Sequence, residues 1–470
     1  MTGEQLGLTE SVSMALGGMI GGGIYAVLGV VAGIAGPATW VAFVAAGVVA
    51  LCAAYSFNVL NRIDDQNRGG SVSFVQAFVG NSTLAGMMGW TLLFGYVGSM
   101  AMYAFAFGEF SVALPVVPET LSGVPLRPAI SVLAVAGFVG LNLLGTRATG
   151  SAENVLVAVK VIVLVLFGLG GIGFALFYAG DPVPLGGGRI ASFGPIMAAA
   201  VSFVAFQGWQ LLFYDQESIA DPKSTIPKAV YVSIPVAVAI YVIVAVATLA
   251  LVPEAIESHP HTALANAAGR ILSPVGLAAV GSIVISLSAL FSTGSAINAT
   301  LFSTGYFAKG LLSDDLLPDR VGDSSESGVP ERTLLLLGAV TAALTAVGTL
   351  DAITSFASVA FIVVFGATSY LAVRQRDHEA VRPAIPAVAV LGVLGFLPLM
   401  FYHLYRAEPG TFYSVLAISV AVVGVEVLYF ERDVIEAEVA EFESEVEAGI
   451  ESDDRFDGDE SASGTDGREV

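Results

Sequence analysis

The chain has 470 residues, of which 55% are hydrophobic and only 13% are charged, and its mean hydropathy is +0.80. Soluble domains usually carry about twice that share of charged residues, so the composition excludes a soluble enzyme and predicts a protein that crosses a membrane several times. The net charge of −21 comes mainly from residues 431–470, which hold sixteen acidic and three basic residues.

A helix needs about 20 consecutive apolar residues to cross a bilayer, and stretches near or above this length recur along residues 1–430. Twelve spans are predicted, at residues 11–35, 38–60, 85–111, 129–147, 153–179, 195–214, 229–252, 274–303, 333–350, 354–373, 384–402 and 411–430. The expected fold class is therefore an all-α polytopic membrane protein with twelve transmembrane helices. Residues 1–430 form its membrane domain, and residues 431–470 form an acidic tail.

Basic residues in the short loops predict the orientation, because Lys and Arg resist translocation across the membrane. With a cytoplasmic N-terminus, the inner loops hold eleven Lys and Arg residues and the outer loops hold four. Both termini are therefore expected to be cytoplasmic, in a multi-pass protein of the cell membrane.

Five glycines interrupt the first span, in the sequence GGMIGGGIY at residues 17–25. Backbone groups that leave a helix are costly in hydrocarbon, so broken helices occur where the backbone faces buried protein or a polar cavity. The glycines therefore predict a broken helix and a ligand site. The alternative is close helix packing, which small residues four apart, such as Gly18 and Gly22, permit.

Lys160 is a basic residue within the fifth span. It lies roughly 10 Å from the cytoplasmic end of that span, at a rise of about 1.5 Å per residue. A lysine at this depth can extend its ammonium group to the interface, or it can be buried and exchange a proton as its surroundings change. Both interpretations stay open from position alone.

A second interruption lies in the sixth span, where Gln207, Gly208 and Gln210 break apolar sequence. The first and sixth spans hold corresponding places in two five-helix halves. Paired interrupted segments of this kind are typical of transporters with an inverted repeat and a central binding site. In the eighth span, hydroxyl groups are candidate ligands for sodium, or else contribute to helix packing: Ser286, Ser288, Ser292 and Thr293.

Several of these segments together resemble the amino acid, polyamine and organocation (APC) superfamily of permeases. The sequence GMIGGGIY at residues 18–25 resembles the first-helix signature of that superfamily. The sequence ESIADPKSTIPKA at residues 217–229 resembles its acidic, proline-containing loop after span six. Shorter matches are GGS at residues 69–71, NLLGTR at residues 142–147, Lys160, and AINATL at residues 296–301.

The resemblance implies a five-plus-five inverted repeat, with residues 11–179 and 195–373 as the two halves and residues 384–430 as two peripheral helices. It implies transport of an amino acid or related amine by alternating access. The substrate carboxylate would bind amide groups of the glycine run, as anions do at helix N-termini, and its ammonium would bind carbonyls in span six. The predicted substrate-binding residues are Ile20, Gly21, Gly22, Gly23, Tyr96, Ala205, Phe206, Gln207 and Trp209.

Some of these assignments keep an alternative. Phe206 and Trp209 either cap the substrate side chain or pack in the membrane core, and Gln207 bonds either the substrate or a neighbouring helix. Gly95 stands before Tyr96 where superfamily members specific for cationic amino acids carry a carboxylate, which favours a neutral substrate. In proton-coupled members the lysine that matches Lys160 approaches the broken first helix, so proton coupling is favoured and sodium stays open.

The chain shows none of the zinc-protease, serine-hydrolase or P-loop motifs of an intramembrane hydrolase or an ATP-driven pump. We therefore expect no enzyme activity, no cofactor, no metal site and no nucleic-acid partner. Within transport, exchange of one amino acid for another is the alternative to import. A protein of the same fold that senses or scaffolds, with the acidic tail as its output, is the alternative to transport.

Overall fold

A computed structural model describes residues 5–64, 69–144, 150–214, 216–318, 322 and 330–430. It divides into two compact units, Met1–Ser419 and Val420–Val470, and the first unit carries all the features discussed below. The predicted acidic tail at residues 431–470 and the motif residues 145–147 lie outside the described part of the chain.

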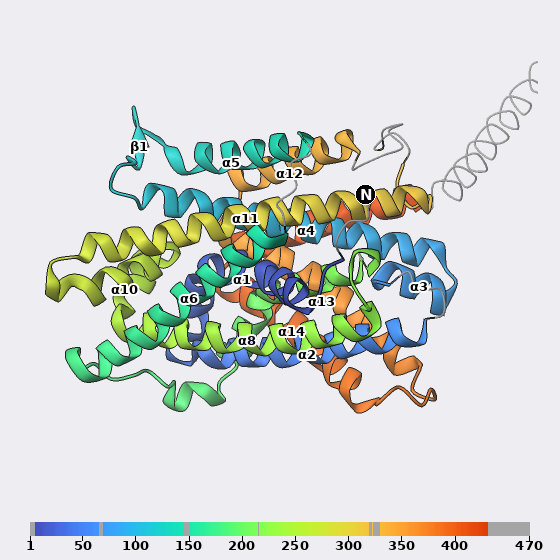
Figure 1. The fold of residues 1–470 in the computed structure, drawn as a ribbon, viewed down its shortest axis with the longest axis horizontal. Coiled ribbons are helices and arrows are strands. Elements are labelled where there is room, and N and C mark those ends of the chain that lie inside the picture. Colours follow the sequence, from blue (N-terminus) through green and yellow to red (C-terminus); the bar gives the residue numbers. More distant parts are fainter. Residues whose placement is uncertain are drawn as a thin grey trace, which may run out of the picture. The chain divides into compact units, whose positions relative to one another are not determined.

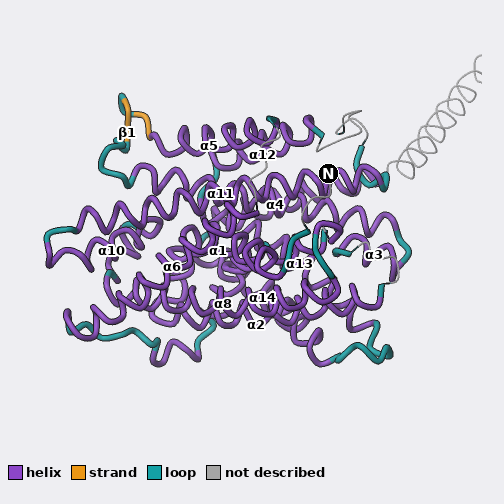
Figure 2. Tube along the Cα trace, viewed as in Figure 1, coloured by secondary structure: helices purple, strands orange, loops and turns teal. Residues whose placement is uncertain are grey.

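Helices make up nearly all of the described chain, and most loops lie at the ends of long helices (Figures 1 and 2). The helices are α1 (Leu8–Ala35), α2 (Thr39–Ile63), α3 (Ser71–Val79), α4 (Ser82–Val112), α5 (Leu126–Leu143), α6 (Gly150–Phe174), α7 (Gly194–Val201), α8 (Pro222–Leu251), α9 (Pro253–Ser258), α10 (Ala263–Leu272), α11 (Ala278–Ser313), α12 (Glu331–Val347), α13 (Leu350–Arg374), α14 (Ala384–Ala407) and α15 (Pro409–Phe430). Two short antiparallel strands, β1 (Thr120–Leu121) and β2 (Val124–Pro125), form a hairpin before α5.

Each predicted span overlaps one of these helices, or a series of short helices in the case of the sixth. Among the described residues, nine segments are long and apolar enough to cross a bilayer, and one of them, Leu8–Ile63, contains both α1 and α2. The all-α polytopic fold class is therefore confirmed. The count of twelve crossings and the inverted repeat remain predictions, since α12 (17 residues) and the short helices of the sixth span are not among these nine segments.

Helix α1 forms the centre of the first unit (Figure 1). It packs against α8, α11, α6, α7 and α4, and nearly every residue from Ala15 to Ala32 is buried. An apolar helix in a membrane can be covered by lipid or by protein, and these contacts show that protein surrounds α1. The glycine run therefore lies where several helices meet.

The prediction of a break in the first span was wrong. Helix α1 continues through the glycine run from Leu8 to Ala35, and none of the five glycines has a positive φ. Glycine permits helical dihedral angles as well as unusual ones, so a run of glycines does not by itself interrupt a helix. What the glycines provide is the absence of side chains at a crowded crossing.

The prediction of a break in the sixth span is confirmed. Helix α7 tightens into a 3₁₀ turn, η4 (Ser202–Phe206), Gln207 is extended, and a second turn, η5 (Trp209–Phe213), follows. Gly208, between the two turns, has a φ of 125°, a conformation that favours glycine. Ser358 of α13 supports the end of α7 by donating to the Val201 carbonyl (2.6 Å) and accepting from the Val204 amide (3.0 Å).

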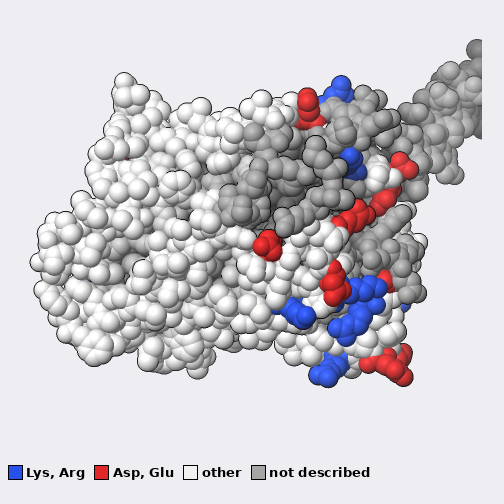
Figure 3. All heavy atoms as spheres, viewed as in Figure 1, with Lys and Arg blue, Asp and Glu red and all other residues white. Residues whose placement is uncertain are grey.

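Charged side chains gather at one end of the face drawn in Figure 3, the end at which α3 and the N-terminal label lie in Figure 1. The opposite end of this face is almost entirely uncharged. Acidic and basic side chains are both present at the charged end, and the orientation of the chain in the membrane stays a prediction.

Candidate functional site

Four glycines of the run in α1 are each in close contact with a different neighbour. A Cβ atom added at Gly18 would lie 2.7 Å from the Cα of Gly208, in the break of the sixth span. At Gly22 it would overlap the ring of Tyr103 of α4. The remaining contacts would be with the Cβ of Ala296 at Gly21 (2.6 Å) and the hydroxyl of Tyr241 at Gly23 (2.6 Å). Close packing, which the sequence left open, is thus one role of these glycines.

Four consecutive carbonyl groups of α1, at residues 17–20, lie within hydrogen-bond distance of polar side chains from four different helices. The donor–acceptor pairs are Lys160 of α6 with Gly17 (3.3 Å), Tyr103 of α4 with Gly18 (3.4 Å), Tyr241 of α8 with Met19 (2.6 Å) and Ser292 of α11 with Ile20 (3.3 Å). In an α-helix these same carbonyls accept from the amides of residues 21–24. The turn predicted to bind a carboxylate through its amides is therefore also the turn whose carbonyls have extra donors.

Tyr241 connects this turn to the break in the sixth span. Its hydroxyl lies 2.6 Å from the Met19 carbonyl and 2.9 Å from the Ala205 carbonyl, and its side chain is fully buried. The ring also packs against Phe206, with 5.4 Å between ring centroids. One hydroxyl thereby contacts both the continuous helix α1 and the break in the sixth span.

Replacing Tyr241 by phenylalanine is expected to destabilise the protein by about 1–3 kcal/mol, because two buried carbonyls lose a shared donor. Thermal unfolding of the purified protein in detergent measures the effect. Tyr370→Phe is the control, because Tyr370 is 55% exposed and should change the midpoint little. Equal midpoints for the two variants would contradict a structural role for the Tyr241 hydroxyl.

Polar side chains also form a buried network around Gly208. Gln210 accepts from the Gly208 amide (2.7 Å), and its side-chain amide lies 3.3 Å from the Tyr96 hydroxyl and 3.4 Å from Gln207 Oε1. Gln207 in turn donates to the hydroxyl of Tyr103. All four side chains are at most 1% exposed. Of the two interpretations of Gln207, contact with a neighbouring helix is the one observed in this state.

The two predicted capping aromatics are fully buried. Trp209 packs against Phe57 (5.2 Å between ring centroids) and Phe365 (5.0 Å), and Phe206 packs against Tyr241. The indole Nε1 of Trp209 has no hydrogen-bond partner among the residues that the structure describes. Both side chains thus pack in an aromatic core beside the break.

Lys160 is only 4% exposed and its ammonium lies against α1. It is therefore buried against the turn at Gly17 rather than extended to the interface. The role of Lys160 in coupling stays a prediction.

Three of the four candidate hydroxyl groups of the eighth span make hydrogen bonds. Ser292 reaches the Ile20 carbonyl, Ser288 pairs with the Tyr25 hydroxyl (2.8 Å) and Thr293 bonds within its own helix.

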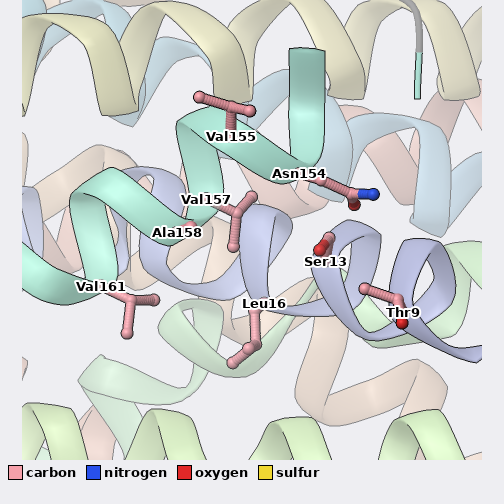
Figure 4. A pocket seen from close by; sticks show the side chains of 8 residues that line it. All are labelled: Thr9, Ser13, Leu16, Asn154, Val155, Val157, Ala158 and Val161. Carbon is pink, nitrogen blue, oxygen red and sulfur yellow. The ribbon is translucent and has the colours of Figure 1, made fainter. Parts of the chain in front are cut away.

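A pocket of about 420 Å³ lies between the N-terminal parts of α1 and α6 (Figure 4). Its lining residues are Thr9, Ser13 and Leu16 of α1 and Asn154, Val155, Val157, Ala158 and Val161 of α6. Leu16 directly precedes Gly17, and Val161 directly follows Lys160. The pocket therefore lies beside the contact between Lys160 and α1, on the half of α1 that is predicted to face the cytoplasm.

The opposite end of α1 is covered. The carbonyl of Pro260, in the turn η7 (Pro260–Thr262), packs directly on Gly29. The ring of His261 packs against Phe105 (5.6 Å), and the guanidinium of Arg127 lies 3.8 Å from the centroid of the same Phe105 ring. These contacts cover the part of α1 around Gly29, which is predicted to lie toward the outer side of the membrane.

The structure brings the predicted substrate residues together around one buried crossing of α1, α4 and the sixth span. It adds two residues that the sequence reasoning missed, Tyr103 and Tyr241. Tyr103 could have been found, because it follows Tyr96 by seven residues and so lies on the same face of α4. Tyr241 carries no such signal, since its position depends on how α8 packs against α1.

Comparison with known proteins agrees with this architecture. Residues 6–425 match the family described as amino acid permease. An uncharacterised protein of Methanocaldococcus jannaschii is 29% identical over 91% of this chain and 95% of its own length. An inner membrane transport protein of Escherichia coli is 28% identical over 84% of this chain and 90% of its own length. A crystal structure of an Eremococcus coleocola manganese transporter mutant superposes with a TM-score of 0.58, at 13% identity, over 91% of this chain and 94% of that one.

Proposed function

We propose, from the premise that the chain belongs to the amino acid permease family, that it imports a neutral amino acid or a related small amine across the cell membrane, driven by protons. The observation that carries this proposal is the convergence of four polar side chains on the carbonyls of residues 17–20, opposite the break in the sixth span. Purely structural crossings of apolar helices have no need of so many buried polar groups, which are costly inside a membrane.

Substrate binding would use both sides of this crossing. The amides of Gly21, Gly22 and Gly23 lie inside the continuous helix α1, so a carboxylate would reach them once the helix opens at the run and leaves them as free N–H groups. The carbonyls of Ala205 and Phe206, at the 3₁₀ turn η4, would accept from the ammonium group. The buried indole N–H of Trp209 is a further donor for a bound substrate.

Coupling would depend on Lys160. A protonated ammonium donates to the Gly17 carbonyl and holds α1 against α6, whereas a neutral amine donates more weakly. Loss of the proton would thus loosen the N-terminal part of α1 beside the pocket of Figure 4. The covered outer end of α1 and this pocket near its other end support alternation between access from outside and access from the cytoplasm. In this orientation both termini would lie in the cytoplasm.

Uptake into proteoliposomes tests the proposal. The full chain is reconstituted and supplied with a panel of labelled amino acids, with and without an inward proton gradient. We expect uptake of a neutral amino acid that the gradient stimulates. Uptake that ignores the gradient but needs amino acid inside would replace import by exchange, and no uptake or binding across the panel by the folded protein would refute transport of amino acids.

A further inference from the structure

The side chain of Tyr103 occupies the centre of the proposed substrate site. Its ring covers Gly22, where an added Cβ would overlap the ring atoms. Its hydroxyl lies 3.4 Å from the Gly18 carbonyl and accepts from the Gln207 side-chain amide. It is only 1% exposed. The residue therefore contacts both α1 and the break in the sixth span, the two elements between which a substrate would bind.

We propose that Tyr103 is a plug that the substrate displaces, and that the space it vacates restricts transport to small neutral amino acids. This inference rests on the proposed function and deepens it by naming the substrate class. A phenol group has about as many non-hydrogen atoms as alanine or serine, so its departure leaves room for a molecule of that size. The phenol also satisfies one carbonyl and one amide N–H, which an amino acid's ammonium and carboxylate can replace.

The surroundings of Tyr103 support a strict size limit. Gly22 faces the ring. The break in the sixth span, from which Gln207 reaches the Tyr103 hydroxyl, carries fully buried aromatic side chains: Phe206 packs against Tyr241, and Trp209 packs against Phe57 and Phe365. A close-packed interior of this kind accommodates an added side chain only at a cost in free energy. The hydrogen-bond partners of Tyr103, the Gly18 carbonyl and the Gln207 side chain, are uncharged, so neither of them is a carboxylate that could pair with a cationic substrate side chain.

The test compares uptake of labelled alanine, serine, leucine and phenylalanine by the full chain and by Tyr103 variants in proteoliposomes. We expect the natural chain to prefer alanine and serine over leucine and phenylalanine by at least about tenfold, as pockets that sort side chains by size do. Tyr103→Ala enlarges the space and should reduce that preference to about threefold or less. The control, Tyr25→Phe, loses a part-buried hydrogen bond to Ser288 of α11 but leaves Tyr103 and its hydrogen-bond partners unchanged, and should keep the order of substrates.

Tyr103→Phe supplies a second readout. This variant keeps the ring and so the size preference, but it loses the hydrogen bonds that hold the plug in place. Because a closed state competes with substrate binding, weakening it by the loss of these hydrogen bonds should lower the KM for alanine by about fivefold or more. The KM of Tyr103→Phe also tests whether Tyr103 blocks the site if Tyr103→Ala fails to fold. Size-exclusion chromatography in detergent would reveal such a failure.

The outcomes separate the two proposals. A natural chain that transports leucine as well as alanine, or a folded Tyr103→Ala variant that keeps the full preference, would overturn the plug while leaving amino acid transport intact. An unchanged or raised KM for alanine in Tyr103→Phe would also overturn it. A folded natural chain that transports no amino acid would refute the proposed function, and the plug with it.

Discussion

Replacing Lys160 by methionine is expected to lower gradient-driven uptake by at least about tenfold, which corresponds to the loss of a hydrogen bond from a charged donor. Methionine keeps the length and apolar character of the stem but has no group that can carry a proton. The ammonium of Lys160 contacts the Gly17 carbonyl at 3.3 Å, so the change removes both the proton carrier and its contact with α1. Uptake is measured in proteoliposomes with and without an inward proton gradient.

Two comparisons make this result specific. Exchange of labelled for unlabelled substrate should persist in Lys160→Met, because the glycine run and the sixth span are untouched. Lys228→Ala serves as the lysine control, since the ammonium of Lys228 meets the Ser224 hydroxyl in an exposed contact (2.9 Å), and uptake by this variant should equal that of the natural chain. Full gradient-driven uptake by Lys160→Met would show that another group carries the proton.

Replacing Gly18 by alanine is expected to destabilise the protein by about 3 kcal/mol, at the upper end of the range for overpacking. The new Cβ would lie 2.7 Å from the Cα of Gly208, and neither partner has a side chain that could move aside. Relief requires α1 to shift away from the break in the sixth span. The thermal unfolding midpoint should fall, and transport should be lost even where some protein folds.

Gly33→Ala is the matched control on the same helix. Gly33 lies within α1, and no described atom outside its own helical turn lies within 4 Å of an added Cβ. Alanine favours the helix by up to about 1 kcal/mol over glycine, so this variant should be as stable as the natural chain or slightly more stable. Equal losses in Gly18→Ala and Gly33→Ala would mean that helix propensity, not the contact with Gly208, governs this helix.

Gly208→Ala places the new side chain on the other element of the same contact, and it also strains the backbone. The φ of Gly208 is 125°, a backbone angle that residues other than glycine rarely adopt. Its destabilisation should therefore equal or exceed that of Gly18→Ala, as the same unfolding measurement would show. A smaller effect at Gly208 would indicate that the turn η5 can rearrange around it.

The fold class was predictable from the sequence because the length and apolar character of a membrane helix are local properties of the chain. The interruption of the sixth span was predictable for the same reason, since Gln207, Gly208 and Gln210 lie together in otherwise apolar sequence. The short helices α3, α9 and α10 were not predicted, because they are too short to stand out from the loops between spans.

The continuity of α1 could not be predicted from the sequence of the glycine run alone. Five glycines are compatible with a break and with a helix, and what decides between them is the environment of the run, in which side chains from α4, α6, α8 and α11 reach its carbonyls. The likeness to known permeases implied that Lys160 would approach this turn, whereas its place along the span did not distinguish burial from extension to the interface.

By itself, then, the sequence determined the helices, the place of the glycine run and the break beside Gln207, because these depend on residues close together in the chain. Only the tertiary structure decided what surrounds them. Tyr103 lies 85 residues from Gly18, and Tyr241 lies 222 residues from Met19. Contacts over such separations arise from how whole helices pack, and no spacing or periodicity within one helix specifies its neighbours.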